Sequence, residues 1–261
     1  MGTLANVVSE IAHAHRLAAD RRSFVRWSTD IMAYRLLRVW GPRRRARMRT
    51  ITLADETRLT YRCSRGDLLA LREVWVDEVY RLPKGQCPRS LVDLGANIGL
   101  ASIWFARTYR CELIVAVEPL PDNARLLRRN LRQNGIAATV LECAVGPAAG
   151  EARFAPSKEP NSGRLAREGE LAVEVCSMDV VLAALGAEGA GADVVKIDIE
   201  GAEEALLGGD VGWLANVGTV VAELHRDDGD AQAVVSALEQ AGLQALPDRA
   251  AGGAVTVFVR T

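Results

Sequence analysis

Four residues with acid–base chemistry follow two short apolar segments of the sequence: Asp198, Glu200, Glu223 and His225. The apolar segments are Asp193–Ile197 and Val217–Ala222, and both have the length of a buried strand. Side chains alternate along a strand, so Asp198 and Glu200 share one side, as do Glu223 and His225. An imidazole with an ordinary pKa of about 6.5 suits a general base, which a carboxylate can orient. The four residues therefore form the predicted catalytic group, with His225 as the base; as an alternative, they could hold a divalent cation.

A turn of small residues follows a third apolar segment, Leu91–Leu94, and residues 93–99 read DLGANIG. Gly95 and Gly99 permit a positive φ and a close approach of a ligand to the backbone. Asn97 also tolerates the left-handed region, so it can replace a further glycine. The helix expected from Ile98 exposes unpaired N–H groups at its start, which favour a carboxylate or a phosphate. The segment therefore predicts a cofactor loop, Ala96 included.

Two classes of cofactor could use this loop. A dinucleotide requires the pattern G-x-G-x-x-G, whereas this chain has Asn97 and Leu100 in place of the second and third glycines. Asp93, before the loop, would repel a pyrophosphate but suits the ammonium group of S-adenosylmethionine. The loop therefore favours S-adenosylmethionine over NAD. Separately, the sequence leads us to assign no metal site.

The next two apolar segments, Leu113–Val117 and Ala138–Leu141, supply further candidate cofactor contacts. Glu118 follows the first and is placed to accept both ribose hydroxyls of a nucleotide, with Pro119 beside it. This feature does not separate S-adenosylmethionine from NAD, because both carry a ribose. Glu142, Cys143 and Ala144 follow the second segment and are expected to line the adenine.

The elements that position these residues alternate between strands and helices from Ser90 onward, which predicts a parallel sheet with helices on both faces. The expected helices are Ile98–Thr108, Asp122–Asn134, Met178–Leu185 and Ala231–Ala241, and Ala254–Val259 is the expected closing strand. Residues 146–176 are expected to be irregular, with β pieces at Glu151–Phe154 and Leu171–Val175.

The first part of the chain has a different pattern. Residues 1–40 have apolar positions at helical spacing, Thr50–Leu53 and Arg58–Arg62 predict a hairpin, and Asp67–Tyr80 predicts an amphipathic helix. We therefore expect an N-terminal extension over residues 1–85 and a catalytic domain over residues 86–261. The extension could cap the acceptor pocket or form a homodimer contact, and its basic run, residues 43–49, is expected to be a solvated face.

Composition excludes several classes of protein. The 261 residues have a formal net charge of −1, which does not favour a nucleic-acid partner. The five cysteines include no C-x-x-C pair, so they indicate neither a zinc site nor a disulfide framework. No apolar run long enough for a membrane span and no secretory leader is found, so we expect a cytoplasmic protein without a membrane partner. His13 and His15 lie on a polar helix and are expected to be solvated or packed.

The chain resembles the FkbM family of S-adenosylmethionine-dependent methyltransferases from about residue 90 to its end. The matching stretches are VDLGANIGLAS (92–102), VEPLPDNARLLRRNL (117–131), AVG (144–146), NSG (161–163), SMDVVL (177–182), VVKIDIEGAEEALLGG (194–209) and ELH (223–225). The segment VKIDIEGAE is the most specific. Cys143 departs from the polar residue that many relatives carry there.

The resemblance implies a Rossmann-like class I methyltransferase fold, α/β, with a mostly parallel seven-stranded sheet and the N-terminal helical and hairpin extension. It also adds Ser102 to the expected cofactor contacts and implies O-methylation of a small hydroxylated acceptor, a natural product or a sugar-containing metabolite. N-methylation, an NAD-dependent oxidoreductase and a nucleotide-binding module without catalysis are the alternatives. The sequence does not identify the acceptor.

Overall fold

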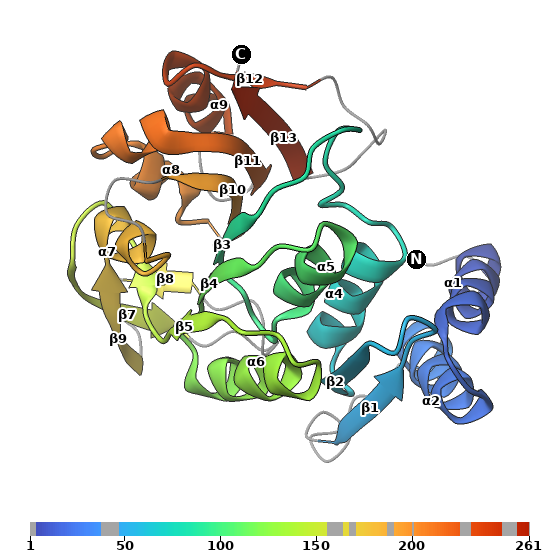
Figure 1. The fold of residues 1–261 in the computed structure, drawn as a ribbon. Helices are drawn as coiled ribbons and strands as arrows, with labels where there is room; N and C mark the ends of the chain where they lie inside the picture. The colour runs from blue at the N-terminus through green and yellow to red at the C-terminus, as the bar shows by residue number, and fades with distance from the viewer. Residues whose placement is uncertain are drawn as a thin grey trace.

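A seven-stranded sheet forms the centre of the molecule, with the strand order β12-β13-β11-β10-β3-β4-β5 (Figure 1). The computed structural model describes residues 4–37, 47–155, 164–166, 171–186, 191–199, 201–224, 231–246 and 255–260. The strands are β3 (Ser90–Leu94), β4 (Leu113–Val117), β5 (Thr139–Leu141), β10 (Ala192–Ile197), β11 (Val217–Glu223), β12 (Leu243–Ala245) and β13 (Val255–Arg260). β13 runs antiparallel to both neighbours, and the other pairs are parallel. The predicted mostly parallel, seven-stranded α/β fold is confirmed.

The strand order reverses between β3 and β10. From β3 the chain builds outward through β4 and β5, and it then returns to build β10 and β11 on the other side. Ligands in open α/β sheets bind outside the carboxyl ends of the strands at such a point, because the crossing loops separate there. The fold therefore places the loop after β3 and the residues after β10 at one opening.

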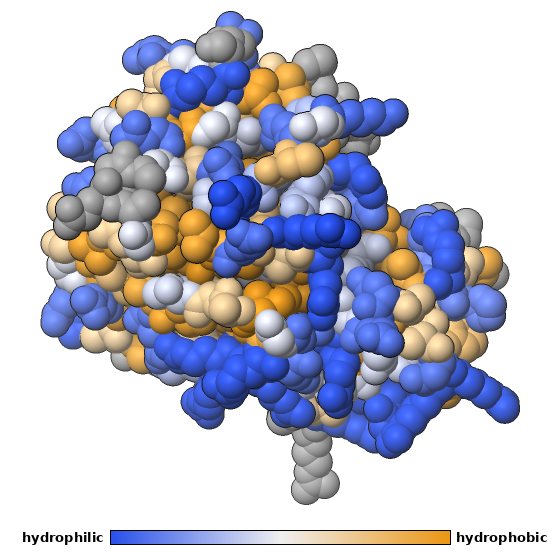
Figure 2. Space-filling view, viewed as in Figure 1, coloured by the Kyte–Doolittle hydropathy of each residue, from blue (hydrophilic) through white to orange (hydrophobic). Residues whose placement is uncertain are grey.

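Helices cover both faces of the sheet, because alternate strand residues turn to opposite sides. Leu91, Ile114 and Val194 face a core with α4 (Arg65–Trp75), α5 (Leu100–Thr108) and α6 (Pro121–Gln133). The opposite core contains α7 (Met178–Ala183), α8 (Glu203–Leu207), the 3₁₀ helix Gly212–Asn216 and α9 (Ala231–Gln240). The polar side of α6, with its exposed arginines, forms the blue lower edge in Figure 2.

The N-terminal extension packs against the α5–α6 side of the sheet (Figure 1). It contains α1 (Leu4–Leu17), α2 (Arg21–Met32), the π-helical turn Ala33–Leu37, the predicted hairpin β1 (Met48–Thr52) with β2 (Arg58–Arg62), and α4. Asn130 of α6 binds the backbone of Thr60, accepting from its N–H at 2.9 Å and donating to its carbonyl at 2.9 Å. One apolar cluster runs through both parts of the chain, so the division at residue 85 stays a prediction.

Several expected details differ in the structure. Residues 144–176 contain a second sheet, ordered β6-β9-β7-β8, rather than two separate β pieces. Its strands are β6 (Ala144–Val145), β7 (Gly150–Ala155), β8 (Arg164–Ala166) and β9 (Leu171–Cys176). The helix expected to reach Tyr80 ends at Trp75, and its cap is Ser64, whose hydroxyl accepts from the Asp67 N–H at 3.2 Å.

The basic run is only partly a solvated face. Arg43, Arg44 and Arg45 lie outside the described residues, but Arg49 forms an ion pair with the buried Asp30, with Nε 3.2 Å from Oδ2. The prediction is therefore wrong for Arg49, because the hairpin turns this side chain inward against α2. Within the described part of the chain, no helix combines the length and the apolar character that a membrane span requires.

Candidate active site

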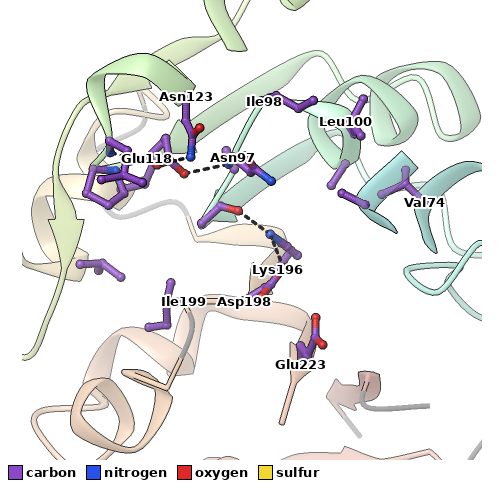
Figure 3. A pocket seen from close by; sticks show the side chains of 18 of the residues that line it. Val74, Asn97, Ile98, Leu100, Glu118, Asn123, Lys196, Asp198, Ile199 and Glu223 are labelled. Carbon is purple, nitrogen blue, oxygen red and sulfur yellow. Dashed lines mark hydrogen bonds and ion pairs between the residues drawn. The ribbon is translucent and has the colours of Figure 1, made fainter. Parts of the chain in front are cut away.

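A cavity of about 250 Å³ opens at the carboxyl ends of the central strands (Figure 3). Its walls come from six places: the loop after β3, the residues after β4, the residues after β5, the end of β10, the end of β11, and the segment from α4 to Tyr80. The lining side chains include Val74, Asn97, Ile98, Leu100, Glu118, Asn123, Lys196, Asp198, Ile199 and Glu223. A cavity thus lies at the strand ends, where the sequence predicts the site.

The loop after β3 has the backbone conformation that its residue types indicate. φ is +75° at Gly95, +50° at Asn97 and +86° at Gly99, so all three residues are left-handed. A Cβ atom on Gly95 would lie 1.8 Å from the backbone oxygen of Asp198. The group that lies close to Gly95 is therefore the backbone of Asp198, at the end of β10. The sequence analysis expected a ligand to approach the backbone here.

Glu118 is fixed at the end of β4 by three donors. One carboxylate oxygen accepts from the Asn97 N–H at 2.9 Å, and the other accepts from the Leu120 N–H at 2.9 Å and from Asn123 Nδ2 at 3.2 Å. Burial raises the pKa of Glu118, and the three hydrogen bonds oppose that rise. The side chain is therefore held rigidly in the wall that the sequence assigns to a ribose.

Two amide oxygens beside Glu118 have unused hydrogen-bonding capacity. Asn97 Oδ1 and Asn123 Oδ1 are buried, and neither has a hydrogen-bond partner among the described residues. Buried polar atoms are nearly always paired in folded proteins, so these two acceptors are suited to a further donor. A ligand with hydroxyl or amino groups would supply it.

Lys196 lies at the centre of a buried charge network below the loop. Its ammonium is 3.1 Å from Asp93 Oδ1 and 3.3 Å from Asp198 Oδ2, and it donates to the Gly95 carbonyl at 2.8 Å. Burial lowers the pKa of Lys196, but the two carboxylates outweigh it and hold that pKa above the ordinary value. Lys196 is therefore charged, and it ties the cofactor loop to β10.

Asp93 does not face the cavity. It is fully buried, with one carboxylate oxygen beside Lys196 and the other accepting from Ser102 Oγ at 2.6 Å. The sequence suggested that this carboxylate meets a cationic ligand, but in the structure Lys196 already balances its charge. Asp93 and Ser102 therefore support the loop from behind.

Tyr80 enters the cavity from the connector after α4. Its hydroxyl donates to Asp198 Oδ2 at 3.1 Å, and its ring centroid is 5.6 Å from Lys196 Nζ. Burial raises the pKa of Tyr80 well above its ordinary value, and the negative charges of Asp198 and Glu223 raise it further. The phenol therefore stays protonated and acts as a donor.

The structure places the other predicted residues in three groups. Those that line the cavity are Gly95, Ala96, Asn97, Glu118, Pro119, Cys143, Ala144, Asp198 and Glu223. Gly99 is the N-cap residue before α5, and a Cβ there would lie 2.5 Å from Leu127 Cδ1. Glu142 is exposed, and its carboxylate is 2.7 Å from Arg128 Nη1. Glu200 and His225 lie outside the described residues, so their predicted roles stay predictions.

Sequence reasoning missed Lys196, and it placed Tyr80 only at the end of a helix that could cap the acceptor pocket. A signal existed for Lys196: a lysine inside an apolar strand needs a buried partner, and β10 pairs it in register with Asp93 of β3. No signal existed for the contact of Tyr80 with Asp198, because the two residues are 118 positions apart in the sequence.

The cavity is strongly acidic. The described lining residues carry four carboxylates, Glu73, Glu118, Asp198 and Glu223, against the single amine of Lys196. Charges interact more strongly in a water-poor cleft than in bulk solvent, so this lining attracts a cation and repels a phosphate. Within the described residues, no group of three or more His, Cys, Asp or Glu side chains is arranged to hold a metal ion.

Comparisons with known proteins identify the family of the chain. Residues 93–244 match the family described as the methyltransferase FkbM domain. Methyltransferase sdnD of Sordaria araneosa is 28% identical over 214 residues, which cover 69% of this chain and 83% of that protein. Methyltransferase 1 of Beauveria bassiana is 25% identical over 203 residues, which cover 68% and 81%. Among solved structures, M. jannaschii TYW2 in complex with AdoMet has a TM-score of 0.42 at 14% identity, over 85% of this chain and 90% of that one.

Proposed function

The chain belongs to the FkbM methyltransferase family, and we propose that it methylates a hydroxyl group of a small natural product or sugar-containing metabolite. The family match spans more than half of the chain, and the donor of this family is S-adenosylmethionine. When bound, S-adenosylmethionine supplies an electrophilic methyl group on a positively charged sulfur. The observation that carries the proposal is the acidic cavity at the carboxyl ends of β3, β4, β10 and β11.

The charge of this cavity supports S-adenosylmethionine over a dinucleotide. S-adenosylmethionine carries a sulfonium and an ammonium, and four lining carboxylates against one lysine favour such a cation. The pyrophosphate of NAD is negatively charged, so the same carboxylates would disfavour it. An oxidoreductase role is therefore disfavoured on electrostatic grounds as well as by the loop sequence.

The residues around Glu118 have the chemistry that an adenosine group requires. The Glu118 carboxylate can accept from ribose hydroxyls, and the unpartnered oxygens of Asn97 and Asn123 can accept from hydroxyl or amino groups. Cys143 and Ala144 lie after β5 in the same wall, as expected for the adenine side. The residues present therefore fit the cofactor.

Asp198 is the described carboxylate best prepared to meet the acceptor. Its Oδ2 is held by Tyr80 and Lys196, while Oδ1 has no hydrogen-bond partner among the described residues and its side chain is 20% exposed. This free oxygen can orient an acceptor hydroxyl by accepting its hydrogen bond. His225 follows Glu223 by two positions, and in this proposal it removes the hydroxyl proton.

The apolar part of the cavity wall excludes water from the reacting groups. Val74 of α4, Ile98 and Leu100 are buried side chains that line the cavity opposite the strand ends. Methyl transfer has a neutral leaving group, so the enzyme's main contribution is to position the acceptor and keep water away. The described residues provide both functions.

Two measurements test the proposal. Calorimetric titration should show binding of S-adenosylmethionine, and weaker or undetectable binding of NAD, to the same preparation. Glu118→Gln should weaken the binding of S-adenosylmethionine by about 10- to 100-fold, because a hydrogen bond to a charged group contributes about 1.5–3 kcal/mol. Glu142→Gln is the matched control, since Glu142 is exposed outside the cavity.

The acceptor is found by incubation with S-adenosylmethionine and a panel of macrolactones, terpenoid alcohols, phenols, hexoses and amines. Mass spectrometry then detects the gain of one methyl group, and the methylated atom is assigned by NMR. A methyl ether supports the proposal. A methylated amine in place of an ether would show that N-methylation is the activity, and preferential binding of NAD would overturn the cofactor assignment.

A further inference from the structure

The N-terminal extension contributes directly to the cavity. Leu69, Ala70, Glu73 and Val74 of α4 line it, and Tyr80 follows in the connector toward β3. Of these residues, Tyr80 makes a polar contact with a strand-end carboxylate, since its hydroxyl binds Asp198 Oδ2 at 3.1 Å. The side chain is only 5% exposed, so the contact is sheltered from water.

We propose that Tyr80 is a positioning residue for methyl transfer: together with Lys196 it fixes the Asp198 carboxylate so that the second oxygen is presented to the acceptor hydroxyl. This inference rests on the proposed function, because it assigns Asp198 to the acceptor. It also gives the extension a defined role in the site that neither the resemblance nor the family match assigns.

The geometry supports this role over one of simple packing. Two donors reach the same oxygen, Tyr80 Oη at 3.1 Å and Lys196 Nζ at 3.3 Å, and they come from different parts of the chain. Lys196 also binds Asp93 and the loop carbonyls, so it is fixed independently of Tyr80. A carboxylate held by one donor can still turn about its side-chain bonds, whereas two donors define its orientation. The phenol remains a donor at neutral pH, because burial and the nearby carboxylates keep it protonated.

The chain contains a matched control for this arrangement. Tyr61 of β2 is fully buried, and its hydroxyl donates to Asp30 Oδ2 at 2.9 Å. The same aspartate is 3.2 Å from the cation Arg49. Tyr61, Asp30 and Arg49 thus repeat the tyrosine–aspartate–cation arrangement, but none of them lines the cavity. Tyr61→Phe removes an equivalent hydrogen bond without touching the site.

The experiment compares Tyr80→Phe, Tyr61→Phe and the unmodified protein. The acceptor is the member of the panel above that gives the highest yield of methylated product, and binding of S-adenosylmethionine is measured by calorimetry. Tyr80→Phe should lower kcat by about 10- to 100-fold, with acceptor KM and cofactor Kd within about 3-fold, because a misplaced catalytic group affects the reaction more than binding. Tyr61→Phe should leave kcat within about 2-fold, whatever its effect on stability.

A double variant tests whether Tyr80 acts through Asp198. If it does, Tyr80→Phe/Asp198→Asn should be no slower than Asp198→Asn, because the two changes affect one unit. An unchanged kcat for Tyr80→Phe, or a double variant slower than Asp198→Asn by the full Tyr80→Phe factor, would overturn the inference. Failure of the proposed function would be seen separately from failure of this inference. The acceptor panel would then give methylated amines or no product. Calorimetry would show directly whether S-adenosylmethionine binds.

Discussion

Gly95→Ala is the substitution whose cost the structure defines most sharply. The backbone at Gly95 has φ +75°, where an L-residue is strained by about 1–2 kcal/mol. The new Cβ would also lie 1.8 Å from the Asp198 carbonyl oxygen and 2.9 Å from its carbon, so β3 and β10 would have to separate locally. Overpacking of this kind costs about 1–3 kcal/mol. The sum predicts a loss of about 2–5 kcal/mol in the free energy of unfolding.

Gly135 provides the control that separates the two contributions. Its φ is +65°, but a Cβ there would meet nothing within 4 Å. Gly135→Ala should therefore cost only the backbone strain, about 1–2 kcal/mol. The difference between the two variants measures the contact with Asp198 alone.

Urea denaturation of both variants gives the two free energies, and calorimetry gives the Kd for S-adenosylmethionine. Gly95→Ala should also weaken cofactor binding by more than about 10-fold, because relief of the overlap moves the loop or Asp198 within the cavity, whereas Gly135→Ala should leave Kd unchanged. Equal destabilisation by the two substitutions would refute the reasoning. So would a Gly95→Ala protein with native affinity, since the loop and β10 would then not be in contact as described.

Three further predictions concern buried groups. Lys196→Met should lower the free energy of unfolding by about 3–5 kcal/mol, because it leaves the fully buried Asp93 without its cation, and adding Asp93→Asn should recover part of this loss in urea denaturation. The pKa of Glu118 is raised above its ordinary value of 4.5, so its ionisation favours the unfolded chain. The stability of the unmodified protein relative to Glu118→Gln should therefore fall as the pH rises from 4.5 through the folded pKa, and a rise would contradict the burial argument. Iodoacetamide should label the exposed Cys87 before Cys111, because burial raises the pKa of Cys111 to about 12. Peptide mass spectrometry measures the order of labelling, and earlier labelling of Cys111 would contradict this prediction.

The central sheet could be predicted from the sequence because its strands are short, apolar and separated by clear turns. Leu113–Val117 begins and ends where its pattern indicates, and the glycine and asparagine of the loop after β3 adopt the left-handed backbone expected of them. The strand-end rule then places Asp198, Glu118 and Glu223 at one opening without knowledge of any contact. These inferences succeed because each depends on local pattern or on topology alone.

The second sheet, between β5 and α7, shows where local pattern is insufficient. Its strands β6 and β8 have two and three residues, too few for any alternation to be recognised. β6 is defined by its pairing with β9, which places Ala144 opposite Val175 and Val145 opposite Cys176. Such strands exist because a partner strand is present, so they cannot be found before the tertiary structure is known.

Asp93 shows a different limit of sequence analysis. The pattern indicates a carboxylate that contacts a cation, but it does not indicate that this cation is Lys196. A carboxylate before a cofactor loop indicates a cationic ligand, yet the nearest cation belongs to the neighbouring strand. Sequence analysis treats each strand end separately, whereas the register of β3 and β10 sets Lys196 opposite Asp93. The consequence concerns Asp198 as well, because the same ammonium lies 3.3 Å from its Oδ2.

Lys196 therefore explains how two carboxylates can lie close together beneath a cofactor loop. Without the lysine, Asp93 and Asp198 would repel each other in a buried setting, and one of them would be protonated or displaced. With it, Asp93 is neutralised internally, and Asp198 retains one oxygen that no described residue occupies. The lysine within VKIDIEGAE is thus a requirement of the site's electrostatics. Tyr80 completes the arrangement from the extension, so the first 85 residues and the sheet together build the acceptor side of the proposed site.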